Sequence, residues 1–294
     1  MKQLMIAMLA MTMVMACKSG RQANVENKQC IDTVLQAQTE AILKECMADS
    51  RADSGQVLVM EVPGQTVVAS AGWAANGRAG YVKTDFSDQR WHTKIGRIAD
   101  YLAMLETGNL TLRDSADTGN GLLKVGGYQI KDYNWRRGGY GMMDVKSGII
   151  FLSEIVYFKC LEKTYGTNKA LERIVEGNAM SMKEMAKMTS DLIARSDTYA
   201  HEIRNVMEAY VEEGLGIKAK PDKGDMAGYA GTTCGTDSIR HLDFCGYFPV
   251  AHPQYIVVAS MKKRGLPASA GNMCAPVARR VAEFLFDLLP VRDL

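Results

Sequence analysis

The stretch 91–108 restricts the possible folds of this chain more than any other. Its sequence is WHTKIGRIADYLAMLETG. Apolar residues recur every three or four positions, at Ile95, Ile98, Ala99, Leu102, Ala103 and Leu105. This spacing predicts one amphipathic helix that buries a long apolar face. We therefore expect it to be the central helix of the domain.

The N-terminal residues have the layout of an export signal. Residues 1–17, MKQLMIAMLAMTMVMAC, contain a single early lysine, an apolar run from Leu4 and the small Ala16 before a cysteine. This pattern is typical of a secretory signal peptide and is too short for a membrane-spanning helix with proper flanks. We predict a signal peptide at 1–16, followed by a tether at 17–26.

The ending VMAC resembles a bacterial lipobox. It implies cleavage before Cys17, a lipid on the sulfur of that residue, and a protein anchored in the cell envelope that faces the periplasm. The alternative is ordinary signal cleavage with loss of Cys17.

Composition excludes several other classes of protein. At 294 residues, 47% hydrophobic and 23% charged, the chain can bury one substantial core. A net charge of +2 gives no support to a nucleic-acid partner. No Cys or His cluster has zinc spacing, and the four histidines are scattered. We predict no metal and no cofactor.

The cysteines beyond position 17 can pair if the protein is exported. They are Cys30, Cys46, Cys160, Cys234, Cys245 and Cys274. An even number in an oxidising compartment allows up to three disulfides in fifteen connectivities. Cys234 and Cys245 flank a predicted connection between strands, so we name them as the candidate pair.

Periodicity predicts the remaining elements. Helices are expected at 31–48, 144–165, 168–177, 181–194, 201–214 and 276–289. Strands are expected at 56–62, 66–72, 227–233, 241–250 and 254–262, the first two joined by a Pro-Gly turn. Between 109 and 143 the chain is rich in Gly, Asp and Asn, which indicates a loop with short strands. Asp144 is the expected N-cap of the helix that follows it.

The order of these segments resembles a known family. The helix at 91–108 is preceded by GQVLVMEVPGQTVVASAGW and followed by GGYQIKDYN, RGGYG and the segment MAGYAGTTCGTDSIRHLDFCGYFPVAHPQYIVVAS. Over 27–294 this resembles the transpeptidase domain of class B penicillin-binding proteins, in the superfamily that includes serine β-lactamases. The resemblance implies an α/β (α+β) fold in which helices flank a five-stranded antiparallel sheet, with an all-helical subdomain.

The family's three catalytic motifs are degenerate here. Its Ser-x-x-Lys motif falls on Lys94 and Arg97. Its Ser-x-Asn motif falls on Leu152, Ser153 and Glu154. Its Lys-Thr-Gly-Thr motif falls on Tyr229, Ala230, Gly231 and Thr232. The surviving serine is at the middle position, which in the family usually faces away from the cleft.

The substituted residues do not support acyl transfer. A serine nucleophile needs a neighbouring base, and a buried lysine serves because its pKa falls toward neutrality. Arg97 stays charged, and Lys94 would form a stable amide that the next step does not resolve. The one literal Ser-x-x-Lys, Ser260 to Lys263, lies on a predicted strand where the two side chains point to opposite faces.

We therefore predict a catalytically inactive, penicillin-binding-protein-like lipoprotein. Its expected partners are peptidoglycan stem peptides or proteins of cell-wall synthesis, and the membrane through Cys17. The alternative is an active D,D-transpeptidase or carboxypeptidase with non-standard residues. The cleft is either filled for stability or still binds a ligand. In both cases Arg97 and Glu154 are expected to form an ion pair, with charged groups within about 6 Å.

Overall fold

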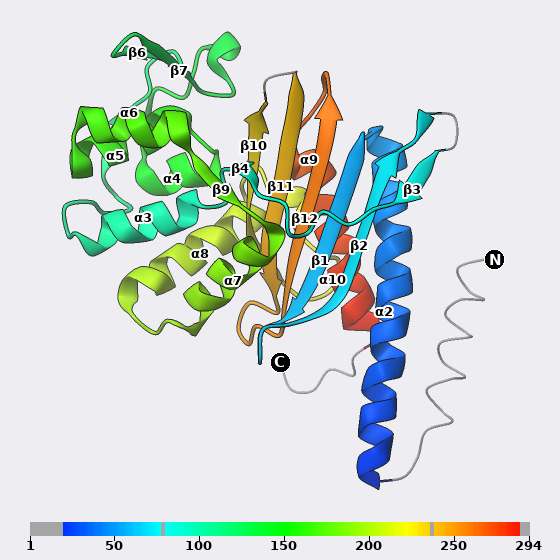
Figure 1. Cartoon of the computed structure of the whole chain (residues 1–294). Helices are drawn as coiled ribbons and strands as arrows, with labels where there is room; N and C mark the ends of the chain where they lie inside the picture. The colour runs from blue at the N-terminus through cyan, green and yellow to red at the C-terminus, as the bar shows by residue number, and fades with distance from the viewer. Residues whose placement is uncertain (1–19, 78–79, 236–237, 289–294) are drawn as a thin grey trace.

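A central antiparallel sheet organises the chain (Figure 1). The computed structural model describes residues 20–77, 80–235 and 238–288, so the predicted signal peptide and Cys17 lie outside the described residues. The strand order is β10-β11-β12-β1-β2-β3. The strands are β1 (Ser54–Glu61), β2 (Thr66–Ala75), β3 (Tyr81–Lys83), β10 (Ala227–Cys234), β11 (Ile239–Phe248) and β12 (Tyr255–Arg264). Because β1 pairs with β12, the first and last strands in sequence lie side by side in the middle of the sheet.

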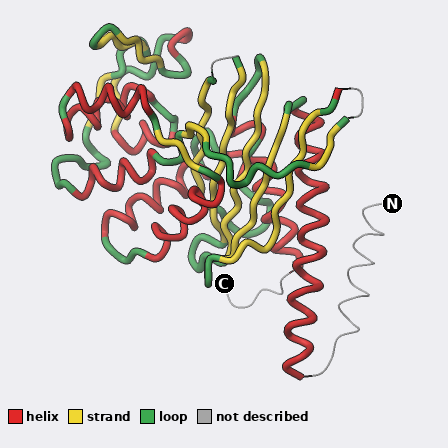
Figure 2. Tube along the Cα trace, viewed as in Figure 1, coloured by secondary structure: helices red, strands yellow, loops and turns green. Residues whose placement is uncertain are grey.

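Helices cover both faces of this sheet (Figure 2). On one side lie α2 (Gly20–Ser50), α9 (Ala270–Met273) and α10 (Ala275–Leu288), and on the other lie α7 (Met182–Ala194) and α8 (Thr198–Glu212). In β11, Cys245 contacts Thr189 of α7, while Phe248 packs against Phe286 of α10. Burial on both faces explains why β1 is a nearly continuous apolar run in which every residue between its two ends is buried.

The remaining helices form a subdomain beside β10. They are α3 (Arg97–Glu106), α4 (Val145–Ile150), α5 (Glu154–Tyr165) and α6 (Thr167–Glu176), with a short 3₁₀ turn at Trp135–Arg137. A second 3₁₀ turn, Ile217–Ala219, packs against α8, α9 and α10. Small two-stranded sheets complete the subdomain, pairing β4 (Trp91–Thr93) with β9 (Asn178–Met180), β5 (Ser115–Asp117) with β8 (Met142–Asp144), and β6 (Leu122–Val125) with β7 (Tyr128–Lys131). Within the described ranges, no helix has the length and apolar character needed to cross a membrane.

The predicted architecture is confirmed, with one strand more than expected. The additional strand β3 pairs with the end of β2 at the edge of the sheet. The predicted hairpin, the helices near 168–214 and the closing helix are all present. The first helix is longer than predicted, because α2 begins at Gly20 and so includes most of the segment assigned to a tether.

Two predicted helices have different boundaries. The helix expected over 91–108 begins only at Arg97, since Trp91–Thr93 forms β4 and the indole Nε1 of Trp91 donates a hydrogen bond of 3.0 Å to Asp243. The helix expected over 144–165 is two helices. Leu152 has a φ of 54°, which ends α4, and a second helix follows. The predicted N-cap at Asp144 is confirmed, because its carboxylate accepts from the Ser147 amide at 2.7 Å.

The predicted Cys234–Cys245 disulfide is wrong. The five cysteines within the described residues whose side chains are placed, Cys46, Cys160, Cys234, Cys245 and Cys274, are all free. In the β10–β11 pairing, Cys234 lies opposite Arg240, whereas Cys245 lies opposite Tyr229. The two cysteines are thus separated by five positions along the ladder, about 17 Å, which is beyond the reach of a disulfide.

Candidate functional site

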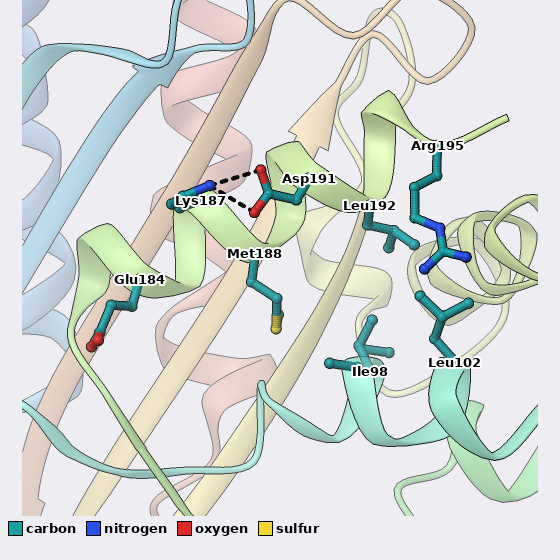
Figure 3. A pocket seen from close by; sticks show the side chains of 9 residues that line it. Ile98, Leu102, Glu184, Lys187, Met188, Asp191, Leu192 and Arg195 are labelled. Atoms are coloured by element: carbon teal, nitrogen blue, oxygen red, sulfur yellow. Dashed lines mark hydrogen bonds and ion pairs between the residues drawn. The ribbon is translucent and has the colours of Figure 1, made fainter. Parts of the chain in front are cut away.

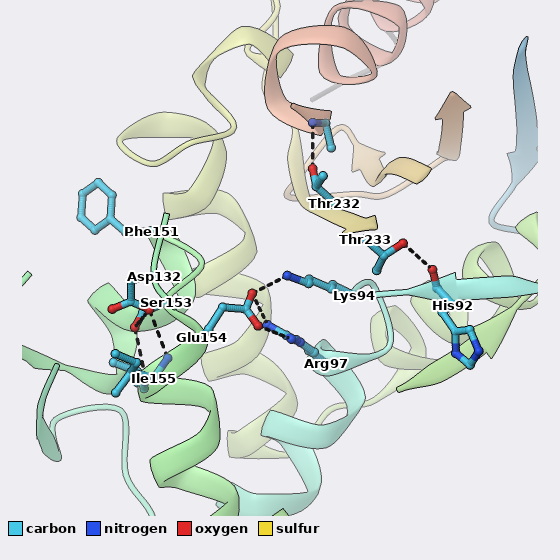
Figure 4. A network of polar contacts seen from close by, with 12 residues as sticks. His92, Lys94, Arg97, Asp132, Phe151, Ser153, Glu154, Ile155, Thr232 and Thr233 are labelled. Atoms are coloured by element: carbon cyan, nitrogen blue, oxygen red, sulfur yellow. Dashed lines mark hydrogen bonds and ion pairs between the residues drawn. The ribbon is translucent and has the colours of Figure 1, made fainter. Parts of the chain in front are cut away.

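Residues at the first two motif positions meet in one largely buried ion cluster (Figure 4). Glu154, the first residue of α5, accepts two hydrogen bonds from Arg97. They run from Nη1 to Oε1 at 3.0 Å and from Nη2 to Oε2 at 2.7 Å. The Nζ of Lys94 also donates to Oε1. The predicted Arg97–Glu154 pair is therefore confirmed. Lys94 is a second cation on the same carboxylate, which the sequence did not predict.

The protonation states of the cluster follow from burial and from these contacts. The exposed fractions are 26% for the Lys94 side chain, 18% for Glu154 and 10% for Arg97. Burial alone would raise the pKa of Glu154, but Arg97 and Lys94 hold it at about 2. The pKa of Lys94 is lowered. Burial is the main cause and the charge of Arg97 adds to it, whereas Glu154 acts in the opposite direction. Burial would also lower the pKa of Arg97, but the carboxylate outweighs it and the pKa rises.

A second polar group supports Arg97 from its far side. The guanidinium lies over the Tyr157 ring, 4.2 Å from its centroid. The Tyr157 hydroxyl donates to Oδ2 of Asp100 at 2.6 Å, and Asp100 also pairs with Arg173 of α6. Asn178 of β9 donates to the same carboxylate oxygen at 3.3 Å. The cluster is thus fixed by α3, α5, α6 and β9 together, and it has little freedom to rearrange.

The second motif places its serine away from the cleft, as expected. Ser153 is 1% exposed and is the N-cap of α5, where its hydroxyl accepts from the Val156 amide at 3.1 Å. The same hydroxyl donates a hydrogen bond to Oδ1 of Asp132 at 2.9 Å. Leu152, in contrast, lines a cavity beside Glu154. Ser153 is therefore a structural residue, and Asp132 is the partner that sequence reasoning missed.

The third motif supplies the wall of the site through β10. Tyr229 and Ala230 are buried, and the Tyr229 ring packs on Tyr210 with centroids 5.3 Å apart. Burial raises the pKa of the Tyr229 hydroxyl. A Cβ on Gly231 would lie 2.7 Å from the Cβ of Lys94 and 3.0 Å from its amide nitrogen, so the absence of a side chain permits this close approach. The Thr232 hydroxyl accepts from the Ala270 amide at 3.2 Å.

Two cavities meet at the ion cluster. One has a volume of 400 Å³ and extends from Lys94 past Tyr133 and Leu152 toward Lys218. The other has a volume of 430 Å³ and extends toward His92 and Arg173. Both are lined by Lys94, Glu154 and Thr232. The Lys94–Glu154 pair therefore lies between the two cavities and faces both.

A separate groove of 340 Å³ lies between α3 and α7 (Figure 3). Its floor is formed by the side chains of Ile98, Leu102 and Met188, and the Lys187–Asp191 ion pair lies at its edge. None of the motif positions lines this groove. The cavities beside Lys94 are therefore the candidate site.

Other hydroxyl groups near the site are engaged elsewhere. Thr93 is 4% exposed, and its hydroxyl accepts from the Ile95 amide at 3.2 Å. Ser260 donates to Asp243 at the limit of normal hydrogen-bond length, whereas Lys263 donates to the Ser50 carbonyl at 2.6 Å. As predicted from their strand positions, Ser260 and Lys263 do not act together.

The sheet, its covering helices and the helical subdomain have the arrangement of transpeptidase domains of penicillin-binding proteins. The structural likeness extends to a peptidoglycan glycosyltransferase from Burkholderia ambifaria, with a TM-score of 0.71 and 18% identity over 88% of this chain and 96% of that one. The transpeptidase domain of Burkholderia pseudomallei penicillin-binding protein 3 gives a TM-score of 0.71 and 16% identity, over 89% of this chain and 97% of that one. The transpeptidase domain of the Legionella pneumophila FtsI4 D,D-transpeptidase gives a TM-score of 0.64 and 15% identity, over 86% of this chain and 96% of that one.

At these identities the likeness concerns the fold. The resemblance inferred from the sequence is confirmed at that level, by chains that this protein covers almost completely. No protein-family model matches the sequence, and a search of curated proteins finds no match.

Proposed function

We propose that this protein is a non-catalytic member of the cell-wall machinery, which binds peptidoglycan stem peptides in the cleft of a transpeptidase fold. The observation that carries the proposal is the buried cluster of Lys94, Arg97 and Glu154. It occupies the positions at which the family has its nucleophile, its base and a substrate-binding amide. A fixed ion cluster offers no hydroxyl to acylate and no neutral base beside one.

The loss of the serine is costly for any acyl-transfer reaction. In a well-studied serine hydrolase, removal of the nucleophile lowers turnover by roughly a millionfold. Here the base is also replaced, by an arginine whose pKa is raised further by Glu154. These substitutions favour a binding role over an unorthodox transpeptidase.

The cleft keeps features suited to a peptide ligand. The 400 Å³ cavity is lined by apolar and hydroxyl groups, including Leu152, Leu215 and Thr232, and by Lys131 and Lys218. Small sites of this kind bind ligands through an apolar surface and a few placed polar groups. A stem peptide offers methyl groups that can contact the apolar surface and carboxylates that can pair with the lysines.

The proposed location follows from the N-terminal sequence. An export signal and lipidation of Cys17 would hold the domain at the cell envelope, facing the periplasm, where peptidoglycan is assembled. Acylation of the mature N-terminus is measured by mass spectrometry of the membrane fraction, and a mature N-terminus without a lipid on Cys17 would contradict this assignment.

The ligand is tested by calorimetric titration of the soluble domain with muropeptides that carry pentapeptide stems. Free D-alanine is measured in the same samples. We expect saturable binding and no release of D-alanine. Absence of binding to both muropeptides and isolated sacculi would refute the binding role, whereas steady D-alanine release would refute the non-catalytic role.

A Lys218→Ala variant provides a control for binding in the cleft. Lys218 is exposed and forms no ion pair among the described residues, so its removal leaves the fold intact. We expect weaker muropeptide binding with an unchanged melting temperature. The matched variant Lys187→Ala, on the edge of the separate groove, is expected to bind as the unmodified protein does.

A further inference from the structure

The ion cluster contains more positive than negative charge. One carboxylate, that of Glu154, pairs with both Lys94 and Arg97, and its Oε1 accepts a hydrogen bond from each of them. All three side chains are less than one-third exposed. A buried charge without a counter-charge is costly, so the cluster is stabilised if one of the two cations becomes neutral.

Only one of the two cations can lose its proton. An arginine guanidinium keeps its charge in proteins, and Arg97 holds both carboxylate oxygens of Glu154 in a two-point geometry. The amine of Lys94 is the more exposed of the two cations and approaches a single oxygen. Lysine amines lose their proton readily when buried beside another cation. The lowered pKa of Lys94 agrees with this assignment, since its causes are burial and Arg97, opposed by Glu154.

Lys94 is also accessible to ligands. It lines both cavities, of 400 and 430 Å³, and its side chain is extended toward Glu154 between them (Figure 4). Glu154 lines both cavities with it. The other charged groups are Arg97, Arg173 and Glu176 in the 430 Å³ cavity, and Lys131 and Lys218 in the 400 Å³ cavity. Lys131 and Lys218 form no ion pair within the part of the chain that the structure describes. The larger excess of positive charge is therefore in the cavity that contains Lys131 and Lys218.

We propose that Lys94 is a nucleophilic amine that forms an imine with small aldehydes bearing an anionic group, with the anion held by Lys131 and Lys218 in the 400 Å³ cavity. The inference does not depend on the proposed binding of stem peptides. It assigns a covalent ligand site to a position that, in the resembling family, carries a hydroxyl group.

The chemistry needs no oxidant, reductant or further reactant. The neutral amine adds its electron pair to the carbonyl carbon and gives a carbinolamine. The nitrogen loses a proton, the hydroxyl gains one and leaves as water, and the nitrogen lone pair forms the C=N bond. Both proton transfers go through solvent and do not need Glu154, which Arg97 keeps as a carboxylate. The sum is amine plus aldehyde giving imine plus water.

The proposal is tested with pyridoxal 5′-phosphate on the folded domain. Imines formed at pH 7.5 are fixed by brief borohydride reduction and quantified site by site by peptide mass spectrometry. Lys187, an exposed lysine in a surface ion pair, is the internal reference. Because burial and Arg97 lower the pKa of Lys94, a larger fraction of its amine is neutral at pH 7.5 than for an ordinary lysine. We expect Lys94 to be labelled faster than Lys187.

Two further comparisons make the test specific. Pyridoxal without its phosphate is expected to label Lys94 more slowly, and Lys218→Ala is expected to remove most of this difference between the two probes. The labelling rate of Lys94 in the unmodified protein is expected to reach its half-maximum at a lower pH than that of Lys187. Equal rates and equal pH midpoints at Lys94 and Lys187 would overturn the proposal, and this comparison requires no variant to fold.

Discussion

Replacing Glu154 with glutamine tests the ion cluster most informatively. The change keeps the shape of the side chain and removes the counter-charge of two buried cations. The pKa of Glu154 is about 2 in the folded protein, below its ordinary value of 4.5. At about 1.4 kcal/mol per unit, this difference corresponds to roughly 3 kcal/mol of folding stability at pH 7. Breaking a buried pair by removing one partner costs about 3–5 kcal/mol in other proteins, which agrees with this estimate.

The pH dependence gives the sign of the effect. Because the folded pKa of Glu154 is depressed, its contribution is present above pH 4.5 and is lost as the pH falls toward 2. The difference in unfolding free energy between the two proteins should therefore be about 3 kcal/mol at pH 7 and about half of that at pH 3. Guanidinium unfolding followed by tryptophan fluorescence measures both values.

A matched control separates burial from pairing. Asp191 also accepts two hydrogen bonds from a lysine, at 2.9 and 2.8 Å, but its side chain is 55% exposed. Asp191→Asn is expected to cost less than about 1 kcal/mol, as exposed pairs do. The reasoning fails if Glu154→Gln costs no more than Asp191→Asn at pH 7, or if its cost does not change with pH.

Three more predictions concern groups near the site. Ser153→Ala removes the N-cap of α5 and leaves Asp132 without its hydroxyl donor, so it should lower the unfolding free energy by about 1–2 kcal/mol; no loss would contradict the capping role. Burial raises the pKa of Asp243 to about 6 despite hydrogen bonds from Ser260, Thr93 and Trp91, so the folded state holds this proton more tightly than the unfolded state. Stability should then fall as the pH rises from 3.8 to 6, by about 3 kcal/mol relative to Asp243→Asn, and parallel pH profiles of the two proteins would refute this. Among the described thiols, exposed Cys234 should react quickly with maleimide, and buried Cys245 only after unfolding; a disulfide-linked peptide containing both would contradict the structure.

The fold was predictable where burial imposes a long, simple pattern. The hairpin of β1 and β2, the strands β10 to β12 and the helices α7 and α10 all follow the apolar periods of the sequence. The short strand β3 has few buried side chains, so its apolar pattern is weak and it was not recognised.

The boundaries that failed depend on tertiary contacts. In β4, Trp91 is held by a hydrogen bond to Asp243, a residue far away in sequence, and no local pattern reports that contact. The break between α4 and α5 requires a leucine with positive φ, which local propensity does not favour. A usable signal was nevertheless present, since Ser153 is a good N-cap residue.

The site was predictable in its positions and only partly in its contacts. The family resemblance placed Arg97 and Glu154 together, and opposite charges at adjoining positions then predicted their pairing. That Lys94 reaches the same carboxylate depends on the path of the chain between β4 and α3. The roles of Asp132 and Asp100 likewise depend on packing between elements that are distant in sequence.

The central claim is that this fold carries no hydroxyl nucleophile that a penicillin can acylate. The most direct test is incubation of the purified domain, residues 20–294, with a fluorescent penicillin beside an active transpeptidase, followed by denaturing electrophoresis. We expect a heat-stable band in the active enzyme and none in this protein, because the positions of serine and base hold a charged cluster. A stoichiometric band, with the label mapped to a hydroxyl near the cleft, would contradict the account.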